Sequence, residues 1–261
     1  MAVPADEQID ASVLDTGTTV VPSDAMAGTP TGAPFPPLRR VVCLGASNVA
    51  RGLSMLVGTT ETMWSEPLDL MIATGHGRSY GMTSSVLGRR LPGILQCGLW
   101  GQLAARSPLP TLGLLTDIGN DLVYAAGAAQ TAEWVEECLR RLSRVCDRIV
   151  VTRLPTDSLA RVGPKRFGIM RRMLFPGSRL KFEEVQTQVK ELDRRVQQLA
   201  ERYQAVPCTQ PGQWFAWDPI HVRRRCMAVA WHTYLSPLSL TDHAPLARGS
   251  LRRFVYLRRQ R

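Results

Sequence analysis

The sequence predicts an α/β fold, in which a central parallel sheet carries helices on both of its faces. Short, continuous apolar runs typical of buried parallel strands alternate along the chain with longer segments in which apolar residues recur every three or four positions. The chain has 261 residues, 44% of them hydrophobic and 21% charged, which is enough for one large domain or two small ones. No apolar run reaches the roughly 18–20 residues that a transmembrane helix needs, so we expect no membrane span.

Five apolar runs are predicted to be the strands of the sheet. They are residues 41–44, 68–73, 111–115, 148–152 and 205–208. The first ends at Gly45 and the second near Gly75, and both are followed by polar, glycine-containing segments. The last run is the weakest, because Pro207 has no backbone N–H and therefore indicates an edge strand or a strand end.

Helices are predicted between these runs. Segments 131–147, 183–203 and 222–235 show the apolar periodicity of helices that pack on one face. The stripe in 183–203 could also be a coiled-coil seam, but it lasts less than three heptads, so we expect it to pack on the sheet. The long connection 155–182 mixes Arg, Met and Phe. It is interpreted as a substrate-contacting loop, with a surface excursion or an oligomer contact as alternatives.

The two ends of the chain are predicted to lie outside the domain, which is assigned to residues 38–236. Residues 1–37 are rich in Ala, Pro, Thr and Gly and show no periodicity, so we expect a disordered leader. Residues 237–261 are expected to form a basic tail. The N-terminus is acidic and lacks the basic and apolar regions of a secretory signal peptide, so a cytoplasmic location is expected.

The formal net charge is +10, and nearly all of the basic residues are arginines. An anion-binding surface is one interpretation, and a dispersed set of solvated arginines is the simpler one. No helix-turn-helix, zinc or RRM signature is present, so we expect no specific nucleic-acid binding. The six cysteines form no CxxC pair, which predicts no zinc site, and they are expected to be reduced thiols.

Functional residues are expected at the carboxyl ends of the strands, where parallel sheets bind their ligands. Ser47 follows the first strand, at a turn into a helix. An exposed hydroxyl and a nearby helix N-terminus both suit a nucleophile whose product is an oxyanion. The alternative is that Ser47 or Asn48 only caps that helix. No GxGxxG or GK[ST] motif occurs here, so a phosphate-binding loop is not predicted.

Three further segments carry candidate residues in chain order. The loop 74–81 contains three glycines, which allow the backbone to approach a ligand closely, whereas His76 is interpreted as a solvent-facing residue. Asn120 follows the third strand and is either an oxyanion donor or a turn residue. Asp218 stands three residues before His221. Its carboxylate can orient the imidazole as in a Ser–His–Asp triad, or it can cap the helix that follows.

In this order the four segments resemble the SGNH (GDSL-like) hydrolase superfamily, which is named for the Ser, Gly, Asn and His of four sequence blocks. The matching stretches are Gly45-Ala46-Ser47-Asn48, Gly119-Asn120-Asp121 and Asp218-Pro219-Ile220-His221. The glycine of the second block is assigned to Gly81, with Gly77 as second choice. The resemblance covers roughly residues 39–235. It departs from the usual pattern at Ala46, where Asp is usual, and at Asn48, where Leu is usual.

The resemblance implies a flavodoxin-like three-layer α/β/α sandwich and a serine esterase. Ser47 is the implied nucleophile, His221 the base, and Asp218 the residue that orients the base. The implied oxyanion hole comprises the N–H groups of Ser47 and Gly81 and the side chain of Asn120. No cofactor and no metal are implied, and the expected partner is a small-molecule or carbohydrate ester.

Two other functions remain alternatives at this stage. The departures at Ala46 and Asn48 are compatible with a non-catalytic SGNH-like binding domain. The Arg-rich surface and tail are compatible with a protein that binds anionic membranes or nucleic acid. The sequence predicts neither the acyl group, the alcohol nor the oligomeric state, and it leaves acyl transfer to a sugar open beside hydrolysis.

Overall fold

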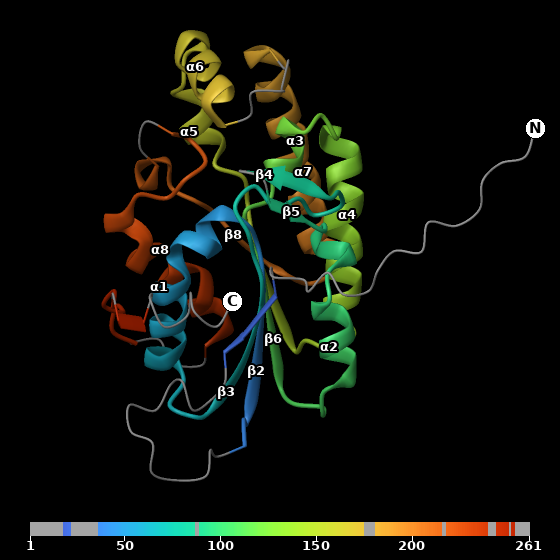
Figure 1. Ribbon diagram of the computed structural model, residues 1–261, viewed down its shortest axis with the longest axis vertical. Coiled ribbons are helices and arrows are strands. Elements are labelled where there is room, and N and C mark those ends of the chain that lie inside the picture. The colour runs from blue at the N-terminus through green and yellow to red at the C-terminus, as the bar shows by residue number, and fades with distance from the viewer. Residues whose placement is uncertain are drawn as a thin grey trace, which may run out of the picture.

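The structure is a computed structural model that describes residues 18–21, 36–86, 89–174, 181–215, 218–239, 244–250 and 252–253. A sheet in the middle carries helices on either side, so that three layers stack (Figure 1). Within the described residues, its strand order is β1-β3-β2-β6-β7-β8. The strands are β1 Thr18–Val21, β2 Arg39–Leu44, β3 Leu68–Ala73, β6 Thr111–Leu115, β7 Arg148–Thr152 and β8 Val206–Cys208.

Five of these strands, β3, β2, β6, β7 and β8, run parallel to one another. Val41 in the middle of β2 lies opposite Leu70 of β3 on one side and Leu112 of β6 on the other. Every residue of β3 and β6 is buried, because helices cover both faces of the sheet. The predicted α/β fold and its five predicted strand runs are therefore confirmed.

Two sets of helices cover the two faces of the sheet. Along β2, Val41 and Cys43 point to one face, and Val42 and Leu44 point to the other. The first face packs against α1 Ser47–Met63 and α8 Met227–Leu235. The second face packs against α2 Leu99–Ala105, α4 Gly127–Leu142 and α7 Phe182–Arg202. The predicted helix 222–235 starts with a short 3-10 turn, Arg224–Cys226, before α8.

A glycine lets α1 and α8 approach closely. A Cβ at Gly52 of α1 would lie 2.3 Å from Nε1 of Trp231, an α8 residue that is only 1% exposed. Any larger side chain there would push α8 away from α1. The segment just before α8 carries His221, so this contact helps to fix the position of that segment.

The predicted loop 155–182 contains two short helices, α5 Thr156–Ala160 and α6 Pro164–Leu174. They lie beyond the carboxyl ends of the strands, at the top of the molecule in Figure 1. Together with the start of α7 they enclose a small apolar cluster of Leu159, Val162, Phe167, Met170 and Val185. This cluster lies apart from the two main cores and gives α6 its own buried face.

Two short segments complete the elements near this end of the sheet. The strands β4 Ser84–Val86 and β5 Arg89–Leu91 pair antiparallel as a separate two-stranded sheet. The helix α3 Asn120–Val123 follows β6 directly. Both lie between the sheet and the α5–α6 segment in Figure 1.

The chain ends differ in part from the prediction. Within the predicted leader, Thr18–Val21 form β1, which pairs antiparallel with β3. Four β-branched residues suit a strand, and β3 would otherwise leave its edge unpaired, which explains the difference for these four residues. In the predicted tail, the Ser54 hydroxyl of α1 donates to the carbonyl of Ser250 at 2.9 Å, so part of the tail packs on α1. Residues 1–17 and 22–35 of the predicted leader and much of the tail lie outside the described residues.

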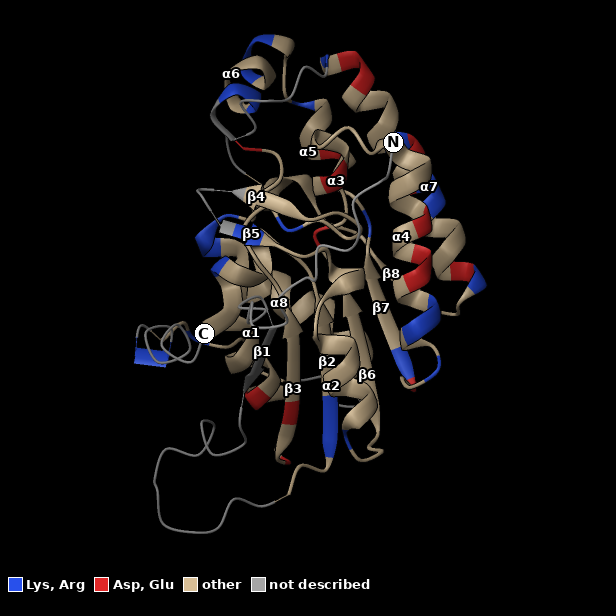
Figure 2. Ribbon diagram, turned by 45° about the vertical axis from the view of Figure 1, so that its right-hand side comes forward, with Lys and Arg blue, Asp and Glu red and all other residues tan. Residues whose placement is uncertain are grey.

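The outer helices carry paired charges. Glu137 of α4 contacts two arginines of its own helix, and Glu191 of α7 does the same. Red and blue segments accordingly alternate along both helices in Figure 2. These two helices therefore do not present a uniformly positive face. No helix among the described residues is long and apolar enough to cross a bilayer.

Candidate active site

Ser47 lies where β2 gives way to α1, at the carboxyl end of the sheet. It is the first residue of α1 and is 7% exposed. Its Oγ lies 3.0 Å from Nε2 of His221, a residue 174 positions later in the chain. A nucleophile and a base within this distance can exchange a proton directly. The structure thus brings together the two residues that the sequence places after the first strand and before α8.

Asp218 lies on the other side of the imidazole. One carboxylate oxygen contacts Nδ1 of His221, and the other accepts the backbone N–H of Ile220 at 2.9 Å and of His221 at 3.3 Å. Asp218 therefore both shapes the turn and holds the ring. With Nδ1 held by the carboxylate, Nε2 is left to face the Ser47 hydroxyl, as proton transfer from Ser47 requires.

Two opposing effects set the pKa of Asp218. Burial by itself raises the pKa of this carboxyl, but the hydrogen bond and charge of His221 and the two backbone N–H groups outweigh it. The pKa of Asp218 consequently lies below its ordinary value. A carboxylate that stays ionised stabilises a proton on the neighbouring imidazole.

Asp117 caps the N-terminus of α1 from the loop after β6. Its Oδ2 accepts the backbone N–H of Ala46 at 2.8 Å, of Asn48 at 2.9 Å and of Val49 at 3.3 Å. The N–H of Ser47 is not in this set, although it lies between them in the sequence. Asp117 adopts a left-handed backbone conformation, with φ of 59°, to reach this position. The cap therefore neutralises the helix end while leaving the Ser47 N–H to a ligand.

Asn48 joins three loops of the site through its side chain. Its Nδ2 donates to Oδ1 of Asp117 at 2.7 Å and to the carbonyl of Ile220 at 2.9 Å, and its Oδ1 accepts the N–H of Val222 at 2.9 Å. The residues on either side of His221 are thereby attached to the start of α1, next to Ser47. Asn48 thus holds the His221 segment at a fixed place relative to Ser47.

Asn120 is the first residue of α3 and lines the same hollow as Ser47. Its Nδ2 donates to the carbonyl of Arg78 at 3.3 Å, which uses one of the two N–H bonds of the amide and leaves the other for a ligand. The preceding Gly119 has φ of 133°, a conformation that only glycine adopts readily, so this glycine allows the tight turn from β6 into α3.

Asp121 holds the loop 74–81 in place from α3. It is fully buried, it accepts the hydroxyl of Ser79, and it accepts the backbone N–H of Tyr80 at 3.1 Å. Burial raises the pKa of Asp121, and these hydrogen bonds oppose the rise. The loop that carries the candidate glycines is therefore fastened next to Asn120.

The two candidate glycines of this loop occupy different surroundings. The N–H of Gly81 donates to Ser79 Oγ at 3.1 Å, and a Cβ there would lie 1.9 Å from the ring of Trp134. Gly77 has φ of 65°, and its carbonyl accepts the Tyr124 hydroxyl at 2.6 Å. Its own N–H is not used in a hydrogen bond between described residues. Gly77 is thus adjacent to Arg78, whose carbonyl accepts the Asn120 amide, whereas Gly81 faces the ring of Trp134.

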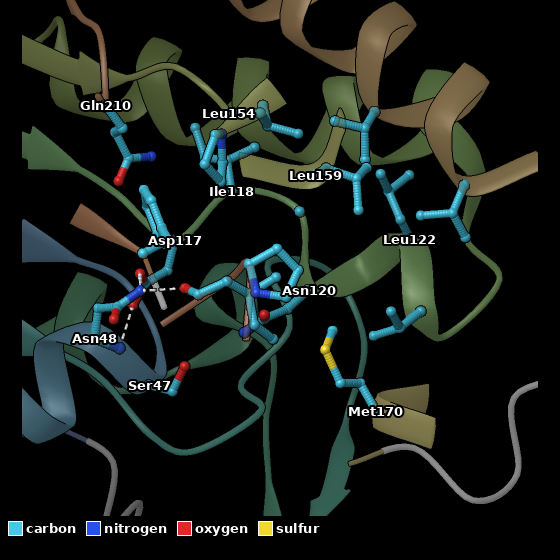
Figure 3. A pocket seen from close by; sticks show the side chains of 18 of the residues that line it. Ser47, Asn48, Asp117, Ile118, Asn120, Leu122, Leu154, Leu159, Met170 and Gln210 are labelled. Atoms are coloured by element: carbon cyan, nitrogen blue, oxygen red, sulfur yellow. Dashed lines mark hydrogen bonds between the residues drawn. The ribbon is translucent and has the colours of Figure 1, made fainter. Parts of the chain in front are cut away.

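A hollow adjoins Ser47 and Asn120 (Figure 3). It has a volume of about 940 Å³, part of which is open to solvent. Apolar side chains form most of its wall beyond Asn120, and they include Leu122, Leu154, Leu159, Phe167, Met170 and Val185. The predicted contact between segment 155–182 and a ligand is thus compatible with the structure, because α5 and α6 supply part of this wall. Among the described residues, no group of His, Cys, Asp and Glu side chains gathers in a way that could hold a metal ion.

Sequence reasoning missed two features of this site. Asp117 was not singled out from the sequence, and Asn48 was taken as a helix cap or a departure from a motif, because the contact between the two residues spans 69 positions of the chain. The apolar wall was also missed, because α5 and α6 show little periodicity of their own. The feature that marks Asp117 is its left-handed backbone conformation directly after a buried strand, and this feature is visible in the structure but not in the sequence.

Comparison with known proteins gives a match at the level of the fold. No family model and no curated protein sequence matches the chain. Among solved structures, a carbohydrate acetylesterase family member from Sinorhizobium meliloti is 16% identical with a TM-score of 0.52, and the match covers 77% of this chain and 96% of that one. The aryl esterase of M. smegmatis is 14% identical with a TM-score of 0.53, covering 77% and 99%. The chain therefore has the α/β fold of these esterases, and the predicted three-layer α/β/α fold with a central parallel sheet is confirmed.

Proposed function

We propose that the chain is a serine esterase of the SGNH type, which hydrolyses a carboxylic ester through Ser47, His221 and Asp218. One observation carries the proposal: Ser47 Oγ lies 3.0 Å from His221 Nε2, and Asp218 occupies the other ring nitrogen. Asp, His and Ser thus form one continuous chain of contacts at the carboxyl end of the sheet. The fold shared with known esterases supports the same conclusion.

The first half of the reaction forms an acyl-enzyme. Ser47 Oγ attacks the ester carbonyl while His221 Nε2 takes the hydroxyl proton. Asp218 stabilises the imidazolium that results. The tetrahedral intermediate then breaks the bond to the alcohol oxygen, and His221 returns its proton to that oxygen. The alcohol leaves, and the acyl group remains on Ser47.

The second half repeats these steps with water. His221 removes a proton from water as the water oxygen attacks the acyl carbonyl, and it then protonates Ser47 Oγ as the acid leaves. The oxyanion of both intermediates is proposed to face the N–H of Ser47 and the free N–H of the Asn120 amide. The surroundings of the two glycines favour Gly77 over Gly81 as the third donor, because the N–H of Gly81 already donates to Ser79.

Labelling with a fluorophosphonate, followed by peptide mapping, tests the proposal. The reagent should modify Ser47, and Ser47→Ala should abolish both the labelling and the hydrolysis of p-nitrophenyl acetate. Ser143→Ala is the matched control, since Ser143 is an exposed residue at the end of α4. His221→Ala should be as inactive as Ser47→Ala, because residues of a triad act as a unit. A folded wild-type chain that neither reacts with the reagent nor hydrolyses any short-chain ester would favour a non-catalytic binding domain instead.

A further inference from the structure

We propose that the hollow beside Ser47 binds the acyl group of the substrate and selects an apolar chain longer than acetyl. This inference rests on the proposed esterase function and adds a substrate class to it. The hollow begins at the nucleophile and continues past Asn120 to Leu122, Leu159 and Met170, as Figure 3 shows. An acyl chain attached to Ser47 would therefore lie against apolar side chains.

The polar groups in the wall favour an apolar ligand over a sugar. Gln210 donates to the carbonyl of Arg153 at 2.5 Å and accepts the Tyr234 hydroxyl at 2.6 Å, so each end of its amide already has one partner within the protein. The side chains of Asp117 and Asn48 bind to each other. Polar groups that are already paired within the protein offer little to sugar hydroxyls.

The one other charged side chain among the described residues of the wall is Arg171. Arg171 of α6 takes part in an interaction within the protein. Ser47 and Asn120 face the reacting carbonyl, and most of the remaining wall is apolar. Burial of methylene groups is the main source of affinity that such a hollow can provide.

The order of the reaction indicates that the acyl group, not the alcohol, occupies the hollow. The acyl group stays attached to Ser47 through both halves of the reaction, so a walled site can hold it throughout. The alcohol must leave after the first half, and water must enter in its place. An alcohol bound in the same hollow would block that exchange, so we place the alcohol toward solvent.

Helix α6 offers a matched pair of positions for testing this. Met170 lines the hollow and is 5% exposed, whereas its neighbour Ile169 is 54% exposed and does not line it. The same substitution at the two positions adds the same charge to the same helix. A difference between the two variants can therefore be attributed to the hollow.

The first experiment measures kcat/KM of the full chain for p-nitrophenyl acetate, butyrate, hexanoate and octanoate below their micellar concentrations. We expect kcat/KM to rise about fourfold for each methylene that the hollow buries, and more than tenfold from acetate to hexanoate. A parallel series keeps the acetyl group and lengthens the alcohol from ethyl to hexyl, and it should change kcat/KM by less than threefold. A flat acyl series, or a steep alcohol series, would overturn the assignment.

The second experiment compares Met170→Asp with Ile169→Asp. Met170→Asp should lower the ratio of hexanoate to acetate kcat/KM at least tenfold, and Ile169→Asp should leave that ratio within twofold. Circular dichroism checks folding, and if Met170→Asp is not folded, Met170→Ala replaces it with an expected fall of a few fold. An equal ratio in wild type and the folded Met170 variant contradicts the proposal.

Failure of this inference and failure of the proposed function give different results. Fluorophosphonate labelling of Ser47 together with a flat acyl series would overturn the acyl site alone. A folded chain whose Ser47 is not labelled, and which hydrolyses no ester of either series, would overturn the esterase function and with it this inference.

Discussion

Replacing Asn48 with Leu should loosen the segment that carries His221. The substitution restores the side chain usual in the motif but removes every hydrogen bond of the Asn48 side chain, and it leaves the backbone N–H bond to Asp117 in place. The N–H of Val222 would lose its acceptor, and the carbonyl of Ile220 and Oδ1 of Asp117 would lose their donor. Val222 is 1% exposed, so water cannot readily replace the lost partner.

The expected magnitude follows from these lost contacts. Leaving one buried polar group without a partner costs about 1–3 kcal/mol, and partial relaxation limits the sum. We therefore expect Asn48→Leu to lower the free energy of unfolding by about 2–4 kcal/mol. The rate should fall as well, by roughly 10- to 100-fold in kcat, because a small displacement of His221 from Ser47 weakens proton transfer.

The assay combines urea unfolding, followed by tryptophan fluorescence, with ester hydrolysis under conditions where the variant is fully folded. Gln130→Ala is the control, since Gln130 makes one exposed hydrogen bond to Glu133 and should change the unfolding free energy by less than about 0.5 kcal/mol. An Asn48→Leu protein as stable and as active as wild type would refute the reasoning. A variant that is destabilised but has full kcat would show that Asn48 supports folding without positioning His221.

Three further predictions concern other parts of the structure. Asn120→Ala should lower kcat by roughly 10²–10³ with little change in KM or melting temperature, and a destabilised but fully active variant would identify Asn120 as a turn residue only. Burial raises the pKa of Asp121 in the folded chain, so its contribution to stability is largest at low pH and falls as pH rises through that pKa. The unfolding free energy of Asp121→Asn minus that of wild type should therefore increase as the pH rises above the ordinary carboxyl pKa of about 4, and urea titrations that show a constant difference would contradict this. Deleting residues 1–37 should leave kcat unchanged and lower the unfolding free energy by only about 1–2 kcal/mol, because the described contact that the deletion removes is the pairing of Thr18–Val21 with β3. A loss of kcat on deletion would show that the leader contributes to the site.

The local sequence pattern determined the buried strands of this protein and the places of two candidate site residues. A buried parallel strand must be apolar along its whole length, because both of its faces are covered, so its run of residues is readable without the fold. The runs at 68–73 and 111–115 coincide with β3 and β6 for this reason. The carboxyl ends of such strands share one edge of the sheet, and Ser47 and Asn120 were found by their place after two of them.

Only the tertiary structure decided how distant loops meet. The roles of Gly77 and Gly81 depend on which way the loop turns and on the position of the Trp134 ring, and the sequence alone had placed Gly81 ahead of Gly77. The contact between Asn48 and Asp117 joins residues 69 positions apart, so no local sequence spacing predicts it. The apolar hollow is likewise built from side chains of several elements. A hydrogen bond or a pocket wall depends on positions in space, and these exist only after the sheet and its helices have packed.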